Sequence, residues 1–123
     1  MSIACAALMC HAPIVVPAIG GSNAERCAST TKAMREVAAK VVEHLPDVGV
    51  LITPHAPRRP LAFGLCFDDE IQGDFLRCGH RERSLRLPGA PAAARAVAEF
   101  AHGAGLETGS LDGYDLDHGS MVP

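Results

Sequence analysis

The chain has 123 residues, a net charge of −3 and 48 % hydrophobic residues. This length fits one domain whose core is large enough to be stable without disulfides or bound metals, and the hydrophobic content argues against intrinsic disorder. The slightly negative net charge argues against nucleic-acid binding. The longest apolar run, Ile3–Cys10, is too short to span a bilayer.

The cysteines and the N-terminus predict a reduced, cytoplasmic protein. There are 5 cysteines, an odd number, and no CxxC motif. The first Lys or Arg is Arg26, so the basic region of a secretory signal is missing. This pattern is typical of proteins that keep their thiols reduced.

The first half of the chain predicts a strand, a helix and a second strand. Ile3–Cys10 reads as a short buried strand. The sequence Ser22–Glu25 has the pattern of a capping box and predicts a helix that runs to about His44, before Pro46 blocks continuation. Val48–Thr53 reads as the second strand. The order predicts a βαβ unit with a parallel strand pair.

The second half predicts more strands and a second helix. Leu61–Phe67 and Ile71–Cys78 read as a hairpin, and Ser84–Leu87 as another short strand. The Ala-rich segment Pro91–His102 predicts a helix, and the locally basic segment Arg77–Arg86 reads as a solvated hairpin edge. Together the elements predict an α/β fold with a mixed, partly parallel sheet flanked by helices.

Two nearly identical motifs follow the two predicted strands of the first half. They are His11-Ala12-Pro13 and His55-Ala56-Pro57. Ligands of α/β proteins bind beyond the carboxyl ends of the strands, and the proline helps to end each strand just past its histidine. We therefore expect the two imidazoles to meet at one rim and to share a metal.

A third candidate, His118, lies in the C-terminal segment next to the carboxylates Asp112, Asp115 and Asp117. Two histidines and one carboxylate on one face of a metal form the facial triad of non-haem Fe(II) oxygenases. A zinc hydrolase that uses Asp112 or Asp115 as the third ligand is an alternative. Hydrogen-bonded surface histidines without a metal are another.

Three segments carry a resemblance to a known family: His11–Gly20, Ile52–Pro57 and Leu116–Pro123. In this order they resemble the N-terminal half of the class III extradiol ring-cleavage dioxygenases of the LigB superfamily. Within it, the chain is most similar to the LigB-like domains associated with AMMECR1 and Memo proteins. The resemblance covers nearly the whole chain and treats residues 1–123 as one LigB-like domain.

This resemblance implies a function and a site. It implies a mononuclear Fe(II) centre, with Zn as the other candidate metal, and cleavage of a catechol-type ring with O₂. His11 and His55 would be the metal ligands. His118 would be the catalytic residue that touches substrate or oxygen, and Asp117 would orient it.

The resemblance also implies that part of the site is missing. In the family, the carboxylate ligand and the acid/base histidine come from the C-terminal half, so we expect a domain truncated at its C-terminus with little or no activity alone. The alternative is a Memo-like, non-catalytic module that binds a metal or ligand and acts through an AMMECR1-like partner domain. A homo-oligomer formed through an unpaired edge is expected as well.

Overall fold

A computed structural model describes residues 2–57 and 59–123. Over these residues the helices are α1 (Pro17–Gly20), α2 (Ala28–Glu43), α3 (Pro91–Gly103) and α4 (His118–Met121). The strands are β1 (Ala62–Leu65), β2 (Glu70–Phe75), β3 (His80–Pro88) and β4 (Glu107–Ser110). Short 3-10 segments cover Pro13–Val15, Gly21–Cys27 and Leu76–Cys78.

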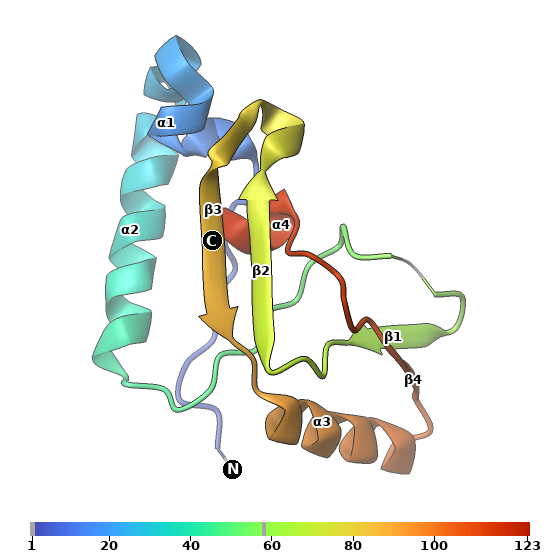
Figure 1. The fold of residues 1–123 in the computed structure, drawn as a ribbon. Helices are drawn as coiled ribbons and strands as arrows, with labels where there is room; N and C mark the ends of the chain where they lie inside the picture. Colours follow the sequence, from blue (N-terminus) through green and yellow to red (C-terminus); the bar gives the residue numbers. More distant parts are fainter. Residues whose placement is uncertain (1, 58) are drawn as a thin grey trace.

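The strands form one parallel and one antiparallel pair (Figure 1). β1 pairs in parallel with β4, from Ala62 opposite Glu107, and the helix α3 precedes β4 in the chain. β2 and β3 form an antiparallel hairpin, with Glu70 opposite Pro88. The expected α/β fold class with helices beside a partly parallel arrangement of strands is confirmed, but in the described part of the chain the strands form two separate two-stranded sheets and not one mixed sheet.

The pairing of the strands differs from the sequence-based expectation. The predicted hairpin of Leu61–Phe67 with Ile71–Cys78 is wrong, because the first segment pairs with β4 and the second pairs with β3. The prediction of strands at Ile3–Cys10 and Val48–Thr53, and of the parallel βαβ unit that they would form, is also wrong. Neither segment makes backbone hydrogen bonds to a neighbouring strand among the described residues, and an apolar run becomes a strand only in such a ladder.

The long helix α2 begins later than the sequence predicts. The segment Gly21–Cys27 is a 3-10 helix, and α2 follows with Cys27 at its N-cap and no side-chain cap bond, so the expected capping box does not start it. The predicted end is confirmed to within one residue, because α2 ends at Glu43. There the ring of His44 bonds to the carbonyl of Lys40 through Nδ1 at 2.8 Å.

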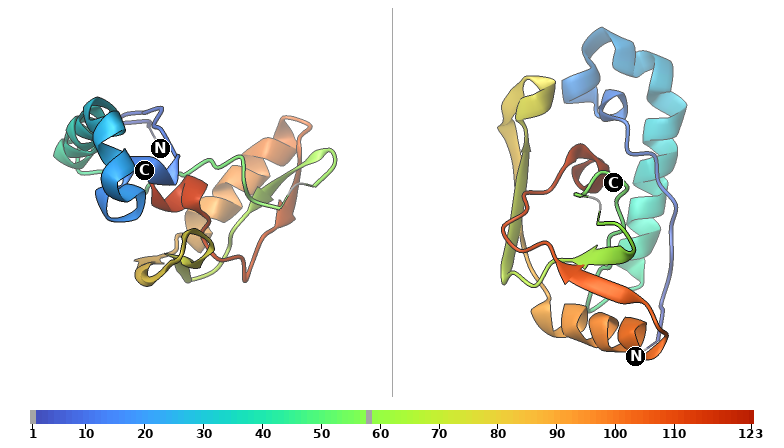
Figure 2. Two further views of the ribbon diagram at one scale, coloured as in Figure 1. Left: turned by 90° about the horizontal axis from the view of Figure 1, so that it is seen from above. Right: turned by 90° about the vertical axis from the view of Figure 1, so that its right-hand side faces the viewer.

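The helix α4 lies between α2 and the β2–β3 hairpin (Figure 2). The buried side chains include Val15, Ala24, Phe75 and, at the start of α4, Ser120. The segment before α4 approaches β2 closely: a Cβ at Gly73 would meet the carbonyl and Cβ of Leu116. None of the helices in the described part of the chain is long and apolar enough to cross a membrane.

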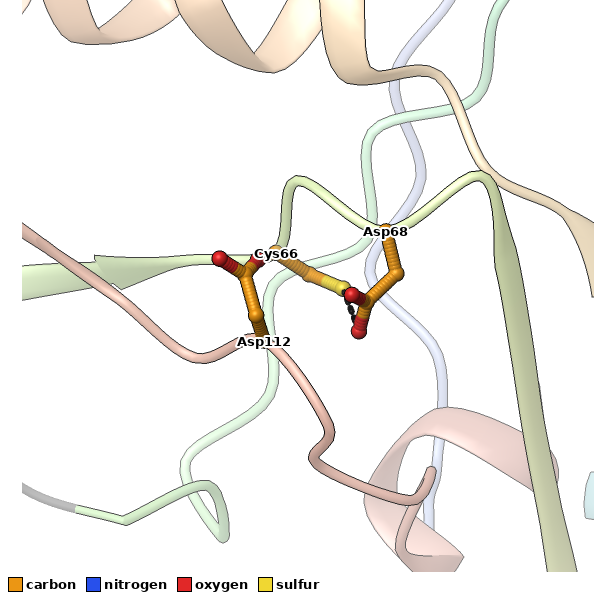
Figure 3. Close-up of side chains that lie close together, drawn as sticks. All are labelled: Cys66, Asp68 and Asp112. Atoms are coloured by element: carbon orange, nitrogen blue, oxygen red, sulfur yellow. Dashed lines mark hydrogen bonds between the residues drawn. The ribbon is translucent and has the colours of Figure 1, made fainter.

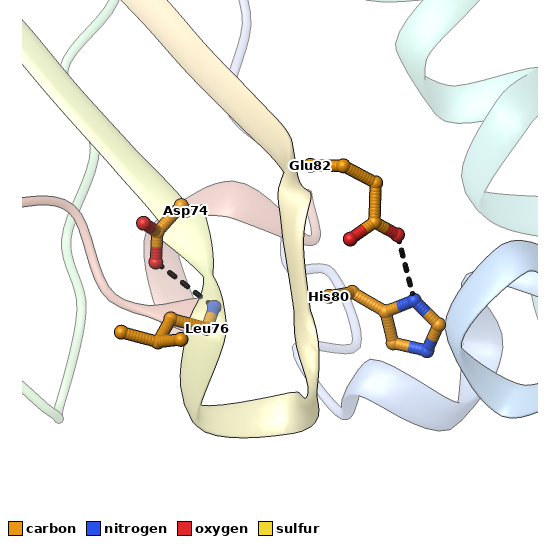
Figure 4. Close-up of polar contacts among 4 residues, drawn as sticks. All are labelled: Asp74, Leu76, His80 and Glu82. Carbon is orange, nitrogen blue, oxygen red and sulfur yellow. Dashed lines mark hydrogen bonds and ion pairs between the residues drawn. The ribbon is translucent and has the colours of Figure 1, made fainter.

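The tip of the hairpin is organised by local polar contacts (Figure 4). The carboxylate of Asp74 accepts the N–H of Leu76 at 2.9 Å, and His80 lies 3.0 Å from the carboxylate of Glu82. A backbone hydrogen bond, and then the one from His80, lower the pKa of Glu82. Since most of β3 is exposed, the interpretation of Arg77–Arg86 as a solvated edge is confirmed.

The extended segments 2–12 and 46–54 expose large apolar side chains. Leu8 is fully exposed, at 100 %, and Ile52 is 90 % exposed. Neighbouring apolar side chains and unpaired backbone groups of this kind favour association with another chain.

We predict that the chain self-associates at high concentration, and that the double substitution Leu8→Lys and Ile52→Lys shifts it towards monomer. Light scattering against concentration measures the change. Val42→Lys is the control, because Val42 is an exposed apolar residue outside these segments. A wild-type chain that stays monomeric throughout would contradict the prediction.

Candidate functional site

Three imidazole rings converge where segments distant in sequence meet. The ring centroid of His55 lies 4.9 Å from that of His11 and 4.3 Å from that of His118. The centroids of His11 and His118 are 6.2 Å apart. The structure thus brings together the histidines of the two motifs, as the sequence led us to expect, and adds the one from the C-terminal segment.

Each histidine is placed by the local structure around it. His11 lies one residue before Ala12, the N-cap of the 3-10 turn Pro13–Val15, where proline occupies the first helical position and needs no hydrogen-bond acceptor for its nitrogen. His118 is the first residue of α4, whose N-cap is Asp117. The Asp117 carboxylate accepts the N–H of Ser120 at 3.1 Å, the usual N-cap bond.

The carboxylate of Asp117 also connects the loop of His55 to α4. The hydroxyl of Thr53 donates to it at 3.2 Å, and the hydroxyl of Tyr114 donates to it at 2.7 Å. In residues 2–57 and 59–123, the partners of this carboxylate are these two hydroxyls and the backbone N–H groups of Gly119 and Ser120. Asp117 acts on His118 through the start of α4, and not through a bond to its imidazole.

Thr53 and Tyr114 are site residues that sequence reasoning missed. A threonine two residues before a histidine and a tyrosine three residues before an aspartate are common and carry no motif. Thr53 reaches the site through its contact with Asp117, 64 residues away, and Tyr114 through its bonds to Asp117 and to the carbonyl of His55. The only sequence signal was their closeness to His55 and Asp117.

The pKa values of Asp117 and Tyr114 are shifted in opposite directions. Partial burial acts to raise the pKa of Asp117. The hydrogen bonds from Tyr114, Thr53 and the N–H groups of Gly119 and Ser120 outweigh it, so this pKa lies below its ordinary value. Burial and the nearby carboxylate raise the pKa of Tyr114 to about 12. The pair is therefore a carboxylate bound by a neutral phenol at neutral pH.

Gly119 allows the loops to approach this closely. A Cβ at this position would lie 2.5 Å from the hydroxyl of Thr53, 2.8 Å from Cδ2 of His55 and 2.9 Å from the carboxylate of Asp117. Only hydrogen fits there without displacement. The glycine in the segment Asp117–Ser120 is thus needed for close approach and not for an unusual backbone angle.

A cleft of about 870 Å³ opens beside His55 and His118. One side is lined by the loop residues His55, Tyr114 and Asp117 and by His118. The β2–β3 hairpin forms the other side. The cleft is large enough for a single aromatic ring with its substituents, since small-molecule pockets measure roughly 300–1,000 Å³.

Asp112, considered above as a zinc ligand, lies in a different group with Cys66 and Asp68 (Figure 3). Its carboxylate accepts the N–H of Phe67 at 2.7 Å, and Asp68 accepts the N–H of Gly113 at 2.7 Å. These bonds join the loops after β1 and β4. The thiol of Cys66 has a raised pKa, first through burial, which disfavours the thiolate that metals bind.

The family model described as the catalytic LigB subunit of aromatic ring-opening dioxygenase matches residues 5–123. The chain belongs to the LigB family. Protein CA_C1420 of Clostridium acetobutylicum is 29 % identical to this LigB-family chain over 125 residues, 94 % of this chain and 27 % of the relative. The chain thus spans about a quarter of that relative's length. No solved structure matches this chain.

Membership in the LigB family relates this chain to ring-opening dioxygenases. The matched region contains all three converging histidines, the cleft and the Asp117 contacts. The family relationship and the geometry therefore concern the same residues.

Proposed function

We propose that this LigB-family chain supplies the histidine side of a non-haem Fe(II) site for extradiol cleavage of a catechol-type ring with O₂. The observation that supports this most directly is the convergence of His11, His55 and His118, of which His55 and His118 line the cleft. The proposal assigns metal binding to His11 and His55. It assigns contact with substrate or oxygen to His118.

The donor chemistry fits the proposed metal. Neutral imidazole is a good ligand for Fe(II) and for Zn(II), and two such ligands leave coordination positions open. A bound Fe(II) ion would serve as a template for catechol and O₂ and as a conduit for electrons between them.

The protein residues themselves would bind and orient the substrate. His118 and Tyr114 both line the cleft, so an aromatic ring held there would have its hydroxyl groups within reach of a neutral phenol and an imidazole. An imidazole in this position can take up or return a proton of a substrate hydroxyl. The hairpin would shield the opposite face of the ring from water.

In this proposal, the carboxylate ligand of the metal comes from a segment outside this chain. Asp117 is already held by Thr53, Tyr114 and Ser120, and Asp112 belongs to the group at Cys66. Asp115 lines the cleft, but among the described residues its carboxylate forms no ligand group with two of the histidines. We therefore expect the isolated chain to bind metal more weakly than a complete site and to turn over little or no catechol.

The test is anaerobic calorimetry with Fe(II) on three variants. We expect His11→Ala and His55→Ala each to abolish detectable binding, because each removes one of two protein ligands. His102→Ala, on α3, is the matched control and should bind as the wild type does.

Binding that survives in both site variants, or no binding by the wild type, would contradict this assignment. A longer chain that binds the metal through these histidines but consumes no O₂ with catechols would favour the non-catalytic, Memo-like alternative.

A further inference from the structure

We propose that Thr53 and Tyr114 are positioning residues: through Asp117 they hold the rings of His55 and His118 together before any metal binds. The expected effect of these residues on metal affinity rests on the proposed function. Its structural part stands on contacts that are independent of the metal.

Thr53 joins the loop of His55 to Asp117. Its hydroxyl donates to the carboxylate at 3.2 Å and accepts the backbone N–H of His55 at 3.2 Å. One oxygen atom therefore fixes both the turn that carries the imidazole and its distance from Asp117. A hydroxyl can donate and accept at the same time, and a methyl group in its place could do neither.

Tyr114 bonds to the same carboxylate. Its hydroxyl donates to Oδ2 of Asp117 at 2.7 Å, and its oxygen lies 3.5 Å from the carbonyl of His55. The short bond is the one that a single phenolic hydrogen would make, and bonds to a carboxylate are stronger than neutral ones. Tyr114 thus keeps Asp117 turned towards the loop of His55.

The other oxygen of Asp117 completes the connection to His118. Oδ1 accepts the N–H of Ser120 at 3.1 Å and so fixes the first turn of α4, which begins at His118. The two oxygens of one carboxylate therefore connect three segments of the chain. Groups that orient metal ligands in this way typically change metal affinity by roughly 10- to 100-fold when they are removed.

The decisive experiment compares Thr53→Val with Thr53→Ser. Valine keeps the shape of the side chain and removes the hydroxyl, and serine keeps the hydroxyl. We expect the nuclear Overhauser contact between the ring protons of His55 and His118, measured without metal, to disappear in T53V and to persist in T53S. Tyr114→Phe, which removes one oxygen atom, should weaken the same contact.

The second readout is Fe(II) affinity by anaerobic calorimetry. We expect a loss of roughly 10- to 100-fold in T53V and Y114F, and little change in T53S. Circular dichroism checks that each variant keeps its helices. If T53V does not fold, Y114F still tests the proposal, because its ring continues to fill the same space.

The outcomes separate this inference from the proposed function. Ring contacts that persist in both T53V and Y114F would overturn the positioning role. A wild-type chain that binds no Fe(II), yet loses the ring contact in T53V and keeps it in T53S, would overturn the metal assignment and still support the positioning role.

Discussion

Replacing Gly119 by alanine is expected to separate the loops of His55 and α4 and to destabilise the fold by about 1–3 kcal/mol, the usual cost of overpacking. The new methyl group would overlap the Thr53 hydroxyl at 2.5 Å, and the ring of His55 at 2.8 Å. Neither neighbour is the free end of a long side chain. The side chains of Thr53 and His55, or the loop that carries them, must therefore move, and we expect the contact between the rings to be lost.

Denaturant unfolding measures the stability of Gly119→Ala, and the ring contact between His55 and His118 measures its effect on the site. Gly103→Ala is the matched control, because a Cβ at the end of α3 meets no atom within 4 Å. It should leave the site intact and change stability by at most about 1 kcal/mol, in the stabilising direction. Equal effects of the two substitutions would show that the close approach at Gly119 is not limiting.

The two long helices were the easiest part of the fold to predict. Composition and glycines predicted a helix at Pro91–His102, and α3 runs from Pro91 to Gly103, because a helix is determined largely by residues within a few positions of one another. Strand pairing is different. β1 pairs with β4 across more than forty residues, so the composition of Leu61–Phe67 identified a strand and said nothing of its partner.

The proximity of His11 and His55 was predicted correctly, but the structural reason given for it was wrong. The expectation was that two parallel strands would end side by side and bring His11 and His55 together. The rings do lie together, but the segments before them are extended chain with no ladder. Contacts of side chains and backbone with Asp117 and Gly119 hold the cluster, and such contacts between distant segments leave no periodic trace in a sequence.

Asp117 should make the stability of the protein sensitive to acid. Its folded pKa is below the ordinary value of 3.8, because hydrogen bonds to the charged form outweigh partial burial. A carboxyl group with a depressed folded pKa stabilises the fold above its unfolded pKa, and this contribution is lost as the pH falls through the folded pKa. We therefore expect part of the stability to disappear below about pH 4.

The substitution Asp117→Ala removes this contribution at every pH. It deletes the N-cap of α4 and the acceptor for Thr53 and Tyr114, so we expect a loss of about 1–3 kcal/mol at pH 7. Asp117→Asn keeps an oxygen that can accept the N–H of Ser120 but carries no charge, so its loss should be smaller and its stability should vary less between pH 5 and pH 2.

Urea unfolding at several pH values measures both effects. Other carboxyl groups titrate over the same range, Glu82 and Asp112 with lowered pKa values among them, so the informative quantity is the difference between wild type and Asp117→Asn. Asp69→Asn, an exposed residue outside the site, should run parallel to the wild type. If the stability of Asp117→Asn varies with pH as that of the wild type does, the charge on Asp117 does not contribute to the fold, and only its role as a helix cap remains.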